Sequence, residues 1–468
     1  MFEENQPITA SLPGAARTTA AGTGARRSIF RFWAPLSAQW LMMSLEGPFL
    51  AAVIARMGDP APNLAAYGVA FAFALLVESP VIMLMSASTA LVEDATSYRR
   101  LRNFANALNA GATALVVLVL LPPVYDLLMR LLELPPHIAE LTYRALWLLL
   151  PWPAAIGYRR FLHGVLIRSG RTRLVAYGTG LRLVAMAGVA LALYATTSLP
   201  GAWVGAAALS AGVCIEALAT RVMAVPALRE ILATPATVHA TSQPGAPVHP
   251  AHAGYRDIAR FYFPLALTSF ITLVVNPLLT FFMGRSPAPV ASLAVYPVAH
   301  SLSFLFRAFG YSYQEASIAM LGRRFEHTAR LSRFGLRIAL AASGAMALVA
   351  FTPLAGFWFG TVSGLPAELT AIATAAARAA TPLPALAVLV SLQQAVLVQG
   401  RHTRAITLGS AIQVLGIALL FPSFGWGLGM TGVTAAMLAL VGGSLAASVY
   451  LARPVARVLA VHADARFW

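Results

Sequence analysis

The chain has 468 residues, of which 59% are hydrophobic and only 11% are charged, and its mean hydropathy is +0.73. Soluble globular proteins carry about 25% charged residues, so the composition excludes a soluble domain and indicates a polytopic membrane protein. The formal net charge is +16, and the sequence contains arginine but no lysine. The single cysteine, Cys214, excludes an intramolecular disulfide.

Twelve stretches are apolar and long enough to cross a bilayer, which takes about 20 such residues. We therefore expect an all-α membrane protein with 12 transmembrane helices. Residues 1–27 lack the apolar core of a signal peptide, and we expect a disordered cytoplasmic tail there and a second tail at 454–468. The expected spans are 31–57, 64–92, 104–122, 138–163, 174–196, 202–224, 258–284, 290–321, 334–359, 367–398, 404–422 and 430–452.

A polar, proline-rich break at 225–257 divides the spans into two sets of six and is typical of a flexible linker. We expect this linker to be cytoplasmic and to join an N-lobe at 28–224 to a C-lobe at 258–453. Its histidines are irregularly spaced and do not match metal-ligand patterns, so no metal site is predicted from them. They are His239, His249 and His252.

Arginines gather in every second loop, whereas the loops between them are neutral or acidic. Because cytoplasmic loops are enriched in basic residues, this pattern predicts that both termini are cytoplasmic, as in a multi-pass protein of a bacterial inner membrane. It also explains most of the net charge without a nucleic-acid partner. The clearest clusters are Arg99, Arg100 and Arg102 after the second span, and Arg168, Arg171 and Arg173 after the fourth.

The two halves of the chain repeat. The run RFWAPL at 31–36 returns as RFYFPL at 260–265, and the same numbering offset, 229, aligns Arg56 with Arg285. Later in each half the offset becomes 231, which aligns Leu134-Pro135 with Leu365-Pro366. Six spans per half give both lobes the same orientation, related by a pseudo-twofold axis along the membrane normal. This architecture favours a transporter over a scaffold, with its substrate site at the interface between the repeats.

Three proline-containing runs interrupt the apolar spans. Proline removes a backbone donor, and irregular backbone at membrane depth is tolerated where it is buried in protein or lines a cavity. Two of the runs carry an acid, which is costly in lipid, so they indicate a transport pathway. The alternative is a pair of kinked packing helices whose acids are satisfied by neighbours. The runs are Glu46-Gly47-Pro48, Glu78-Ser79-Pro80 and Asn276-Pro277.

Charged residues at membrane depth are the first candidates for the site. Glu78 has Arg307 as its repeat mate, and we expect the two to approach each other or share a substrate across a central cavity. Glu46 is the best candidate for a proton or sodium site, although it could equally bind a cationic substrate. Arg182 and Glu216 are expected to form a fixed ion pair within the first half.

Other polar side chains are weaker candidates. His300 is either a proton relay or a satisfied core histidine, and Gln394 either binds substrate or bonds a neighbouring helix. No HExxH or GxSxG run occurs in the sequence, so no enzyme is predicted, and the only cofactor expected is a coupling proton or sodium ion. The remaining candidates are Asn276, Tyr311 and Glu315.

Several short runs resemble the progressive ankylosis (ANK) family, namely Phe261 to Pro264, Asn276-Pro277, Leu293 to His300, and 64–70 in the first half. The two six-helix lobes resemble the wider multidrug/oligosaccharidyl-lipid/polysaccharide (MOP) exporter superfamily, which includes the MATE transporters. The resemblance implies a V-shaped bundle, a cavity lined by the first, second, seventh and eighth spans, and alternating access. ANK proteins are associated with export of pyrophosphate, nucleotides and citrate. MATE relatives expel cationic drugs with protons or sodium, and other members flip lipid-linked sugars.

The leading hypothesis is a monomeric secondary active exporter of a small anionic solute. A drug exporter of the MATE type and a lipid-linked sugar flippase are the alternatives. A flippase would predict a strongly basic cavity, whereas we count four arginines against four acids at depth. They are Arg144, Arg182, Arg307 and Arg378, and Glu46, Glu78, Glu216 and Glu315.

Overall fold

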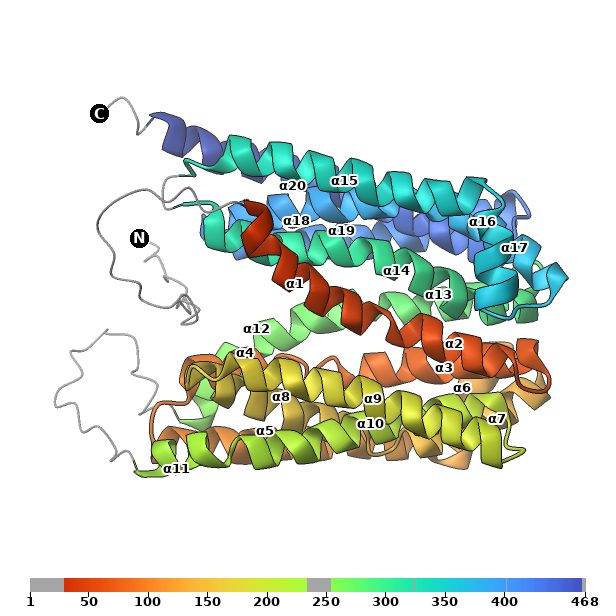
Figure 1. Cartoon of the computed structure of the whole chain (residues 1–468), viewed down its shortest axis with the longest axis horizontal. Coiled ribbons are helices and arrows are strands. Elements are labelled where there is room, and N and C mark those ends of the chain that lie inside the picture. The colour runs from red at the N-terminus through yellow and green to blue at the C-terminus, as the bar shows by residue number, and fades with distance from the viewer. Residues whose placement is uncertain (1–28, 234–253, 323–324, 401, 465–468) are drawn as a thin grey trace.

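The computed structural model describes residues 29–233, 254–322, 325–400 and 402–464. All regular secondary structure in these ranges is helical, and the helices form two lobes that lie side by side (Figure 1). The N-lobe comprises α2 (Glu46–Ala55), α3 (Pro60–Glu78), α4 (Leu84–Leu91), α5 (Ala95–Leu120), α6 (Pro122–Leu131), α7 (Pro136–Leu148), α8 (Trp152–Arg168), α9 (Thr172–Thr196), α10 (Gly201–Met223) and α11 (Val225–Ala233).

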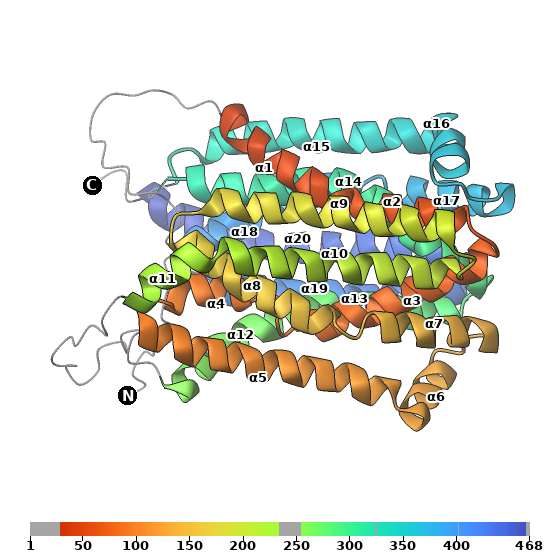
Figure 2. The same ribbon diagram turned by 60° about the horizontal axis from the view of Figure 1, so that its bottom comes forward.

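The C-lobe repeats this order. It comprises α13 (Val275–Gly284), α14 (Pro289–Met320), α15 (Thr328–Phe351), α16 (Leu354–Gly356), the short π-helix η2 (Phe357–Val362), α17 (Ala367–Ala380), α18 (Leu383–Gln399), α19 (Thr403–Pro422), a second π-helix η3 (Ser423–Gly427) and α20 (Gly432–Asp464). Figure 2 shows the same two groups of helices from a second direction.

Eleven helices among the described residues are long and apolar enough to cross a membrane. The predicted span that is not among them is the fourth, 138–163. It is built from α7 and α8, which are separated by a turn at Leu149–Pro151, and α8 carries Arg159 and Arg160. The helices α7 and α8 together still cover the predicted stretch, as two shorter segments.

Two boundaries differ from the sequence prediction. The linker predicted at 225–257 begins as helix α11, whose Ala227, Leu228 and Ile231 are buried, so its apolar face extends the N-lobe. The tail predicted at 454–468 continues α20 as far as Asp464. The predicted tail at 1–27 and the histidines at 239, 249 and 252 lie outside the described residues.

The helices break beside the three prolines. Pro80 and Pro277 leave the carbonyls of Leu76 and Leu273 without their usual helical donors, because proline has no N–H. The polar residue before each proline supplies a replacement. The Ser79 hydroxyl donates to Leu76 O at 2.7 Å, and the Asn276 amide to Leu273 O at 3.5 Å. The third break lies at Leu45, between α1 (Ile29–Ser44) and α2, two residues before Gly47-Pro48.

The first helix of each half crosses to the other lobe. The α1 helix belongs to the first half of the sequence but packs on α14, where the Trp33 indole N–H donates to Ser312 at 2.9 Å. In return α12 (Tyr255–Leu273) reaches the N-lobe, where the Tyr262 hydroxyl donates to the carbonyl of Pro80. This reciprocal exchange ties the lobes together and is visible in Figure 1.

The two lobes are in extensive contact where α3 crosses α14. At the crossing Gly68 faces Pro297, which the first repeat offset identifies as its own repeat mate. A Cβ atom on Gly68 would stand 3.4 Å from the Pro297 ring. Because a residue can contact its own repeat mate only close to the symmetry axis, this crossing marks the pseudo-twofold axis of the fold.

Away from this crossing the helices of the two lobes move apart toward the end where α1 begins and α20 ends (Figure 1). We call this the terminal end. At the opposite end Arg56 donates to Thr361 and Val362, and Arg285 pairs with Glu133, so bonds between the lobes hold that end together. We call it the closed end.

Candidate functional site

The N-lobe contains a buried cluster of charged side chains centred on Glu216, which has no exposed surface. Arg159 on α8 places its Nη1 atom 2.7 Å from Glu216 Oε2. Arg182 on α9 places its Nε atom 3.5 Å from the same oxygen and also pairs with Glu46 on α2. His163 Nε2 lies 3.8 Å from Glu216 Oε1. Four helices therefore contribute to one polar centre inside an apolar lobe.

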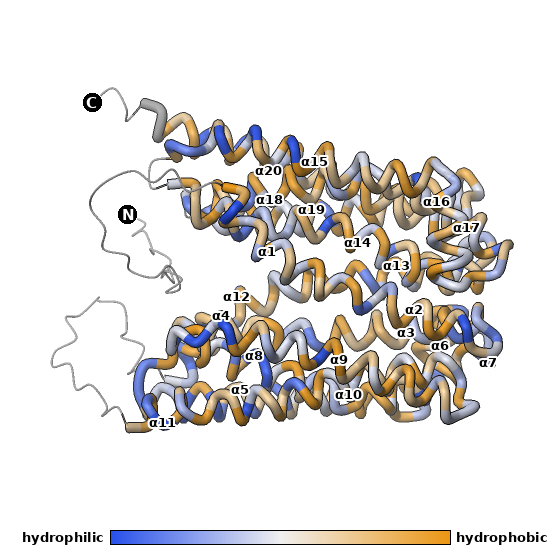
Figure 3. Tube along the Cα trace, in the orientation of Figure 1, coloured by the Kyte–Doolittle hydropathy of each residue, from blue (hydrophilic) through white to orange (hydrophobic). Residues whose placement is uncertain are grey.

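Small residues make room for this cluster. Gly178 on α9 faces Glu216, and a Cβ there would be 3.5 Å from the carboxylate. Gly212 on α10 lies against Arg182, and a Cβ there would be 3.1 Å from the Arg182 carbonyl. The helices can thus approach closely while two guanidinium groups surround one carboxylate. Figure 3 shows hydrophilic residues midway along the otherwise largely apolar N-lobe.

Glu78 lies in the N-lobe interior rather than opposite Arg307. It is 6% exposed, and its Oε2 atom accepts a hydrogen bond of 2.7 Å from the indole N–H of Trp152 on α8. The expectation that Glu78 and Arg307 meet across a central cavity is wrong in this conformation. The repeat places the two residues at equivalent backbone positions, but Trp152 turns the acid toward its own lobe.

Glu46 also pairs within its own lobe, since Arg182 is its partner. Its side chain keeps 13% of its surface exposed. The pairing predicted between Arg182 and Glu216 is therefore one part of a larger network, in which Arg182 serves two carboxylates.

The C-lobe presents a different surface along one face of α14. Ring contacts run from Tyr296 to His300 at 5.3 Å and from His300 to Phe304 at 6.4 Å. Phe304 in turn lies 5.8 Å from Tyr311. One helical turn before Tyr311, Arg307 donates to its hydroxyl at 2.6 Å. Successive spacings of three and four residues place all these side chains on one helix face.

Helix α1 covers the terminal end of this face. Trp40 lies 5.3 Å from the Tyr311 ring, and its indole N–H donates to Glu315 Oε1 at 3.0 Å. We call Tyr296, His300, Phe304, Arg307, Tyr311 and Glu315 the α14 polar face. Within the described part of the chain, no carboxylate lies within 4 Å of the Arg307 guanidinium.

The charged residues in the interior are not all those that the sequence predicted at membrane depth. Arg144 and Arg378 are exposed at the lobe surfaces, where they stack on Trp203 and Phe351. Arg159 and Arg160 replace them in the interior. Glu315 is exposed as well, so the interior of the described chain holds four arginines against three acids, which is not a strongly basic interior. The acids are Glu46, Glu78 and Glu216, and the arginines are Arg159, Arg160, Arg182 and Arg307.

Sequence reasoning missed Arg159, Arg160, His163 and Trp152. Arg159, Arg160 and His163 fall in the last five residues of the predicted fourth span, whereas Trp152 lies near its middle. A signal was present, because three basic or titratable residues fall close together inside the apolar stretch 152–167. Arg160 is half-buried with its Nη1 atom 3.9 Å from the sulfur of Met85, and no carboxylate of the described chain lies within 4 Å of it.

The remaining candidates are half-buried. Asn276 satisfies the break in the α12–α13 segment, as described above. Gln394 has a buried neighbour, Gln393, whose amide donates to Ser448 O at 2.9 Å and so packs α18 against α20. Gln394 is the repeat mate of His163, so the same position is titratable in one lobe and neutral in the other.

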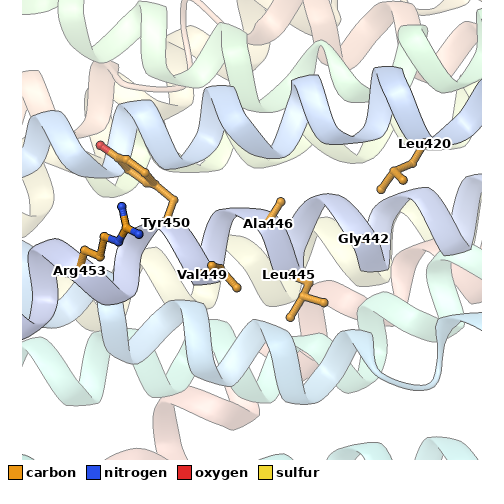
Figure 4. A pocket seen from close by; sticks show the side chains of 7 residues that line it. All are labelled: Leu420, Gly442, Leu445, Ala446, Val449, Tyr450 and Arg453. Carbon is orange, nitrogen blue, oxygen red and sulfur yellow. The ribbon is translucent and has the colours of Figure 1, made fainter.

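A groove of about 660 Å³ lies on α20 and α19, apart from these polar residues (Figure 4). Gly442 and Ala446, which have little or no side chain, are among the residues that line it. Apolar residues border it, and only Tyr450 and Arg453 bring polar atoms to one end. The groove shares no residue with the N-lobe cluster or with the α14 polar face.

No family model and no curated protein sequence matches the chain. Solved structures do match over nearly its whole length. The inward-facing conformation of a multidrug resistance MATE family transporter of the MOP superfamily superposes with a TM-score of 0.65 and 16% identity, covering 91% of this chain and 98% of that one. The chain has the fold of a MATE-type MOP transporter.

Two further structures agree with this assignment. The lipid II flippase MurJ, in an inward closed conformation, superposes with a TM-score of 0.65 at 12% identity, covering 92% of this chain and 91% of that one. The outward-facing conformation of a multidrug resistance MATE family transporter gives 0.56 at 16% identity, covering 92% of this chain and 96% of that one. The TM-score is higher for the inward-facing and the inward closed structures than for the outward-facing one. The likenesses confirm the predicted fold class and an integral, multi-pass membrane protein, whereas the narrower ANK resemblance stays a prediction.

Proposed function

We propose that this protein is a secondary active exporter that works by alternating access between its lobes, and that its substrate is a small anionic solute such as pyrophosphate, a nucleotide or citrate. Arg307 is the observation that carries the anionic assignment. Its guanidinium group is half-buried on the α14 polar face, its side-chain partner is the neutral Tyr311 hydroxyl, and no carboxylate of the described chain neutralises it. A fixed, planar cation is well suited to bind carboxylate or phosphate oxygens.

The arginines of the N-lobe support this assignment by contrast. Arg159 and Arg182 are already neutralised by Glu216 and Glu46. A substrate anion would have to displace a carboxylate there, whereas at Arg307 it would compete only with a neutral hydroxyl. The rings of Phe304 and Tyr311 beside Arg307 add flat surfaces on which an aromatic or planar anion can stack.

Glu46 is the proposed coupling residue. It stands beside the break at Leu45, it keeps part of its surface exposed, and its partner Arg182 has a second carboxylate in Glu216. A proton or a sodium ion bound by Glu46 would therefore release Arg182 without leaving that cation unpaired. Such an exchange couples an ion gradient to the packing of α2 against α9.

Reconstituted vesicles test the proposal. Movement of labelled pyrophosphate, ATP, citrate, a cationic dye and a lipid-linked sugar is measured with and without imposed proton and sodium gradients. We expect gradient-dependent movement of at least one anion, a large loss in Arg307→Gln and little change in Arg378→Gln, which removes the same charge from the lobe surface. Movement of the dye alone would overturn the anionic assignment and favour a MATE-type drug exporter, whereas movement of the lipid-linked sugar alone would favour a flippase.

A further inference from the structure

We propose that Arg56 and Arg285 are the gate residues of this protein: each caps the end of a short helix in the opposite lobe, and together they hold the closed end shut. Release of both caps is the step that lets this end open. The inference goes beyond the proposed function, because it concerns how the lobes are held together and does not depend on which solute is carried.

The first cap is made by Arg56, at the C-terminal end of α2. Its Nη1 atom donates to Ala52 O of its own helix at 2.7 Å. Its Nη2 atom crosses between the lobes and donates to Thr361 O at 2.6 Å and Val362 O at 2.8 Å. Those two carbonyls end η2, so the N-lobe arginine closes the last turn of a C-lobe helix.

The second cap is made by Arg285, at the C-terminal end of α13. Its Nη1 atom donates to Phe281 O of its own helix at 3.3 Å. Its Nη2 atom donates across the lobes to Leu131 O, at the end of α6, and lies 3.1 Å from Glu133 Oε1. The C-lobe arginine thus closes the last turn of an N-lobe helix.

The two caps are related by the internal repeat at each of their parts. Arg56 and Arg285 are repeat mates, and so are Ala52 and Phe281, the acceptors on their own helices. The cross-lobe acceptors Leu131 and Val362 are also mates, at the offset that holds later in each half. An isolated arginine–carbonyl contact could be incidental, but the same contact built twice about the pseudo-twofold axis is a property of the repeat.

The chemistry of helix ends explains why an arginine serves here. The last carbonyls of a helix have no partner within it and carry the negative end of the helix dipole. A guanidinium group offers several N–H donors in a rigid fork, so it can bind two such carbonyls and its own helix at once. These are hydrogen bonds from a charged donor, which are stronger than neutral ones. They can also break as a unit when the lobes separate, because each cap is a set of bonds from a single side chain.

The backbone after each capped helix is shaped for this contact. Gly364 and Glu133, which are again repeat mates, both have left-handed backbone, with φ of +74° and 52°. A Cβ on Gly364 would come within 3.1 Å of the Arg56 side chain, so glycine leaves the space that this arginine occupies. At the second cap Glu133 tolerates the same backbone and adds a charged partner for Arg285.

Packing beside the second cap shows how close the lobes come. A Cβ atom added to Gly284 would stand 2.4 Å from the carbonyl oxygen of Leu132 in the other lobe. The backbones of the two lobes are therefore in direct contact beside Arg285. An end that is packed this tightly in one conformation must separate in another if the fold works by alternating access.

Pulsed electron–electron double resonance in lipid nanodiscs tests the proposal without any substrate. In a Cys214→Ser background, cysteines for spin labels replace the exposed Leu199 and Leu428, which lie in connections at the closed end of opposite lobes. We expect a single short distance in the reference protein and a second, longer distance in the Arg56→Gln/Arg285→Gln double variant. Each single variant should raise the ratio of open to closed protein by on the order of tenfold, since losing one hydrogen bond from a charged donor changes an equilibrium constant by about that factor.

The Arg144→Gln/Arg378→Gln pair is the matched control. It removes the same two charges, but these arginines stack on Trp203 and Phe351 of their own lobes, and their bonds to Glu140 and Ala350 also stay within a lobe. An unchanged distance in the Arg56→Gln/Arg285→Gln variant, or an equal change in the control pair, would overturn the proposal.

If the double variant does not fold, the single variants and Arg285→Lys test the proposal in its place. Lysine keeps the positive charge of arginine but lacks its forked set of donors. Transport can fail for any tested solute without affecting these distances, so the gate and the proposed function are tested separately.

Discussion

The two lobes have one backbone plan but very different interiors. In the N-lobe, Glu216 sits between Arg159 and Arg182 at complete burial. At the equivalent position of the C-lobe stands Ala447, and the mate of Arg182 is Gln413, which bonds Ser444. The repeat therefore preserves what the backbone needs, whereas the charges have diverged. We infer that the N-lobe cluster and the α14 polar face perform separate tasks.

The largest expected effect is on the N-lobe cluster. Glu216→Gln leaves Arg159 and Arg182 buried without their shared carboxylate, and breaking a buried ion pair in this way costs about 3–5 kcal/mol. We expect a marked fall in the thermal unfolding midpoint of the purified protein. The equivalent change in the C-lobe, Ala447→Gly, removes no charge and should cost far less. Equal losses in both variants would show that the cluster contributes nothing beyond packing.

The next effect is on the α14 polar face. Arg307→Gln removes a charged donor from a site where no described carboxylate depends on it, so stability should change little. Binding of an anionic substrate should weaken by about 1.5–3 kcal/mol, which is roughly a tenfold to hundredfold rise in the dissociation constant. Titration of the purified protein with the transported anion checks this value. A large fall in the thermal unfolding midpoint, with the dissociation constant unchanged, would show that Arg307 has a structural role instead.

A smaller effect is expected at Glu78. Trp152→Phe keeps an aromatic ring and removes the N–H that donates to Glu78, which leaves a buried carboxyl oxygen unsatisfied at a cost of about 1–3 kcal/mol. Glu78→Gln in the same background should recover part of the loss, because an amide is less costly to bury than a carboxylate. A thermal unfolding series over the single and double variants measures this coupling. Additive losses would mean that the two side chains do not act as a pair.

The smallest effect is expected at the surface of the closed end. Glu133 is 59% exposed where it pairs with Arg285, and exposed ion pairs contribute about 0–1 kcal/mol. Glu133→Gln should therefore leave both stability and the distance between spin labels nearly unchanged. A change as large as that of Arg285→Gln would show that Arg285 holds the closed end through the carboxylate of Glu133 and not through the carbonyl of Leu131.

Much of the architecture followed from local properties of the sequence. The apolar stretches predicted the helices, the two close repeat offsets predicted two equivalent lobes, and the prolines at 48, 80 and 277 fall at or beside helix breaks. The helices and their breaks depend on chain length, periodicity and the missing N–H of proline, so neighbouring residues suffice to predict them. The repeat becomes visible only when the two halves of the sequence are compared. The linker was harder to delimit, because the amphipathic stretch that forms α11 is short and is flanked by polar residues.

The sequence did not predict which side chains the charged residues would pair with. The repeat relates Glu78 to Arg307 by position, yet Trp152 takes the carboxylate of Glu78, and that choice depends on how α8 packs on α3. Likewise Arg182 could be assigned to Glu216, but its second partner, Glu46, lies far away in the chain on a different helix. Ion pairs and lobe-to-lobe caps join side chains that only packing brings together. The sequence by itself determined where helices run and break, and the tertiary structure decided which charges meet, because burial forces each one to find a partner across the fold.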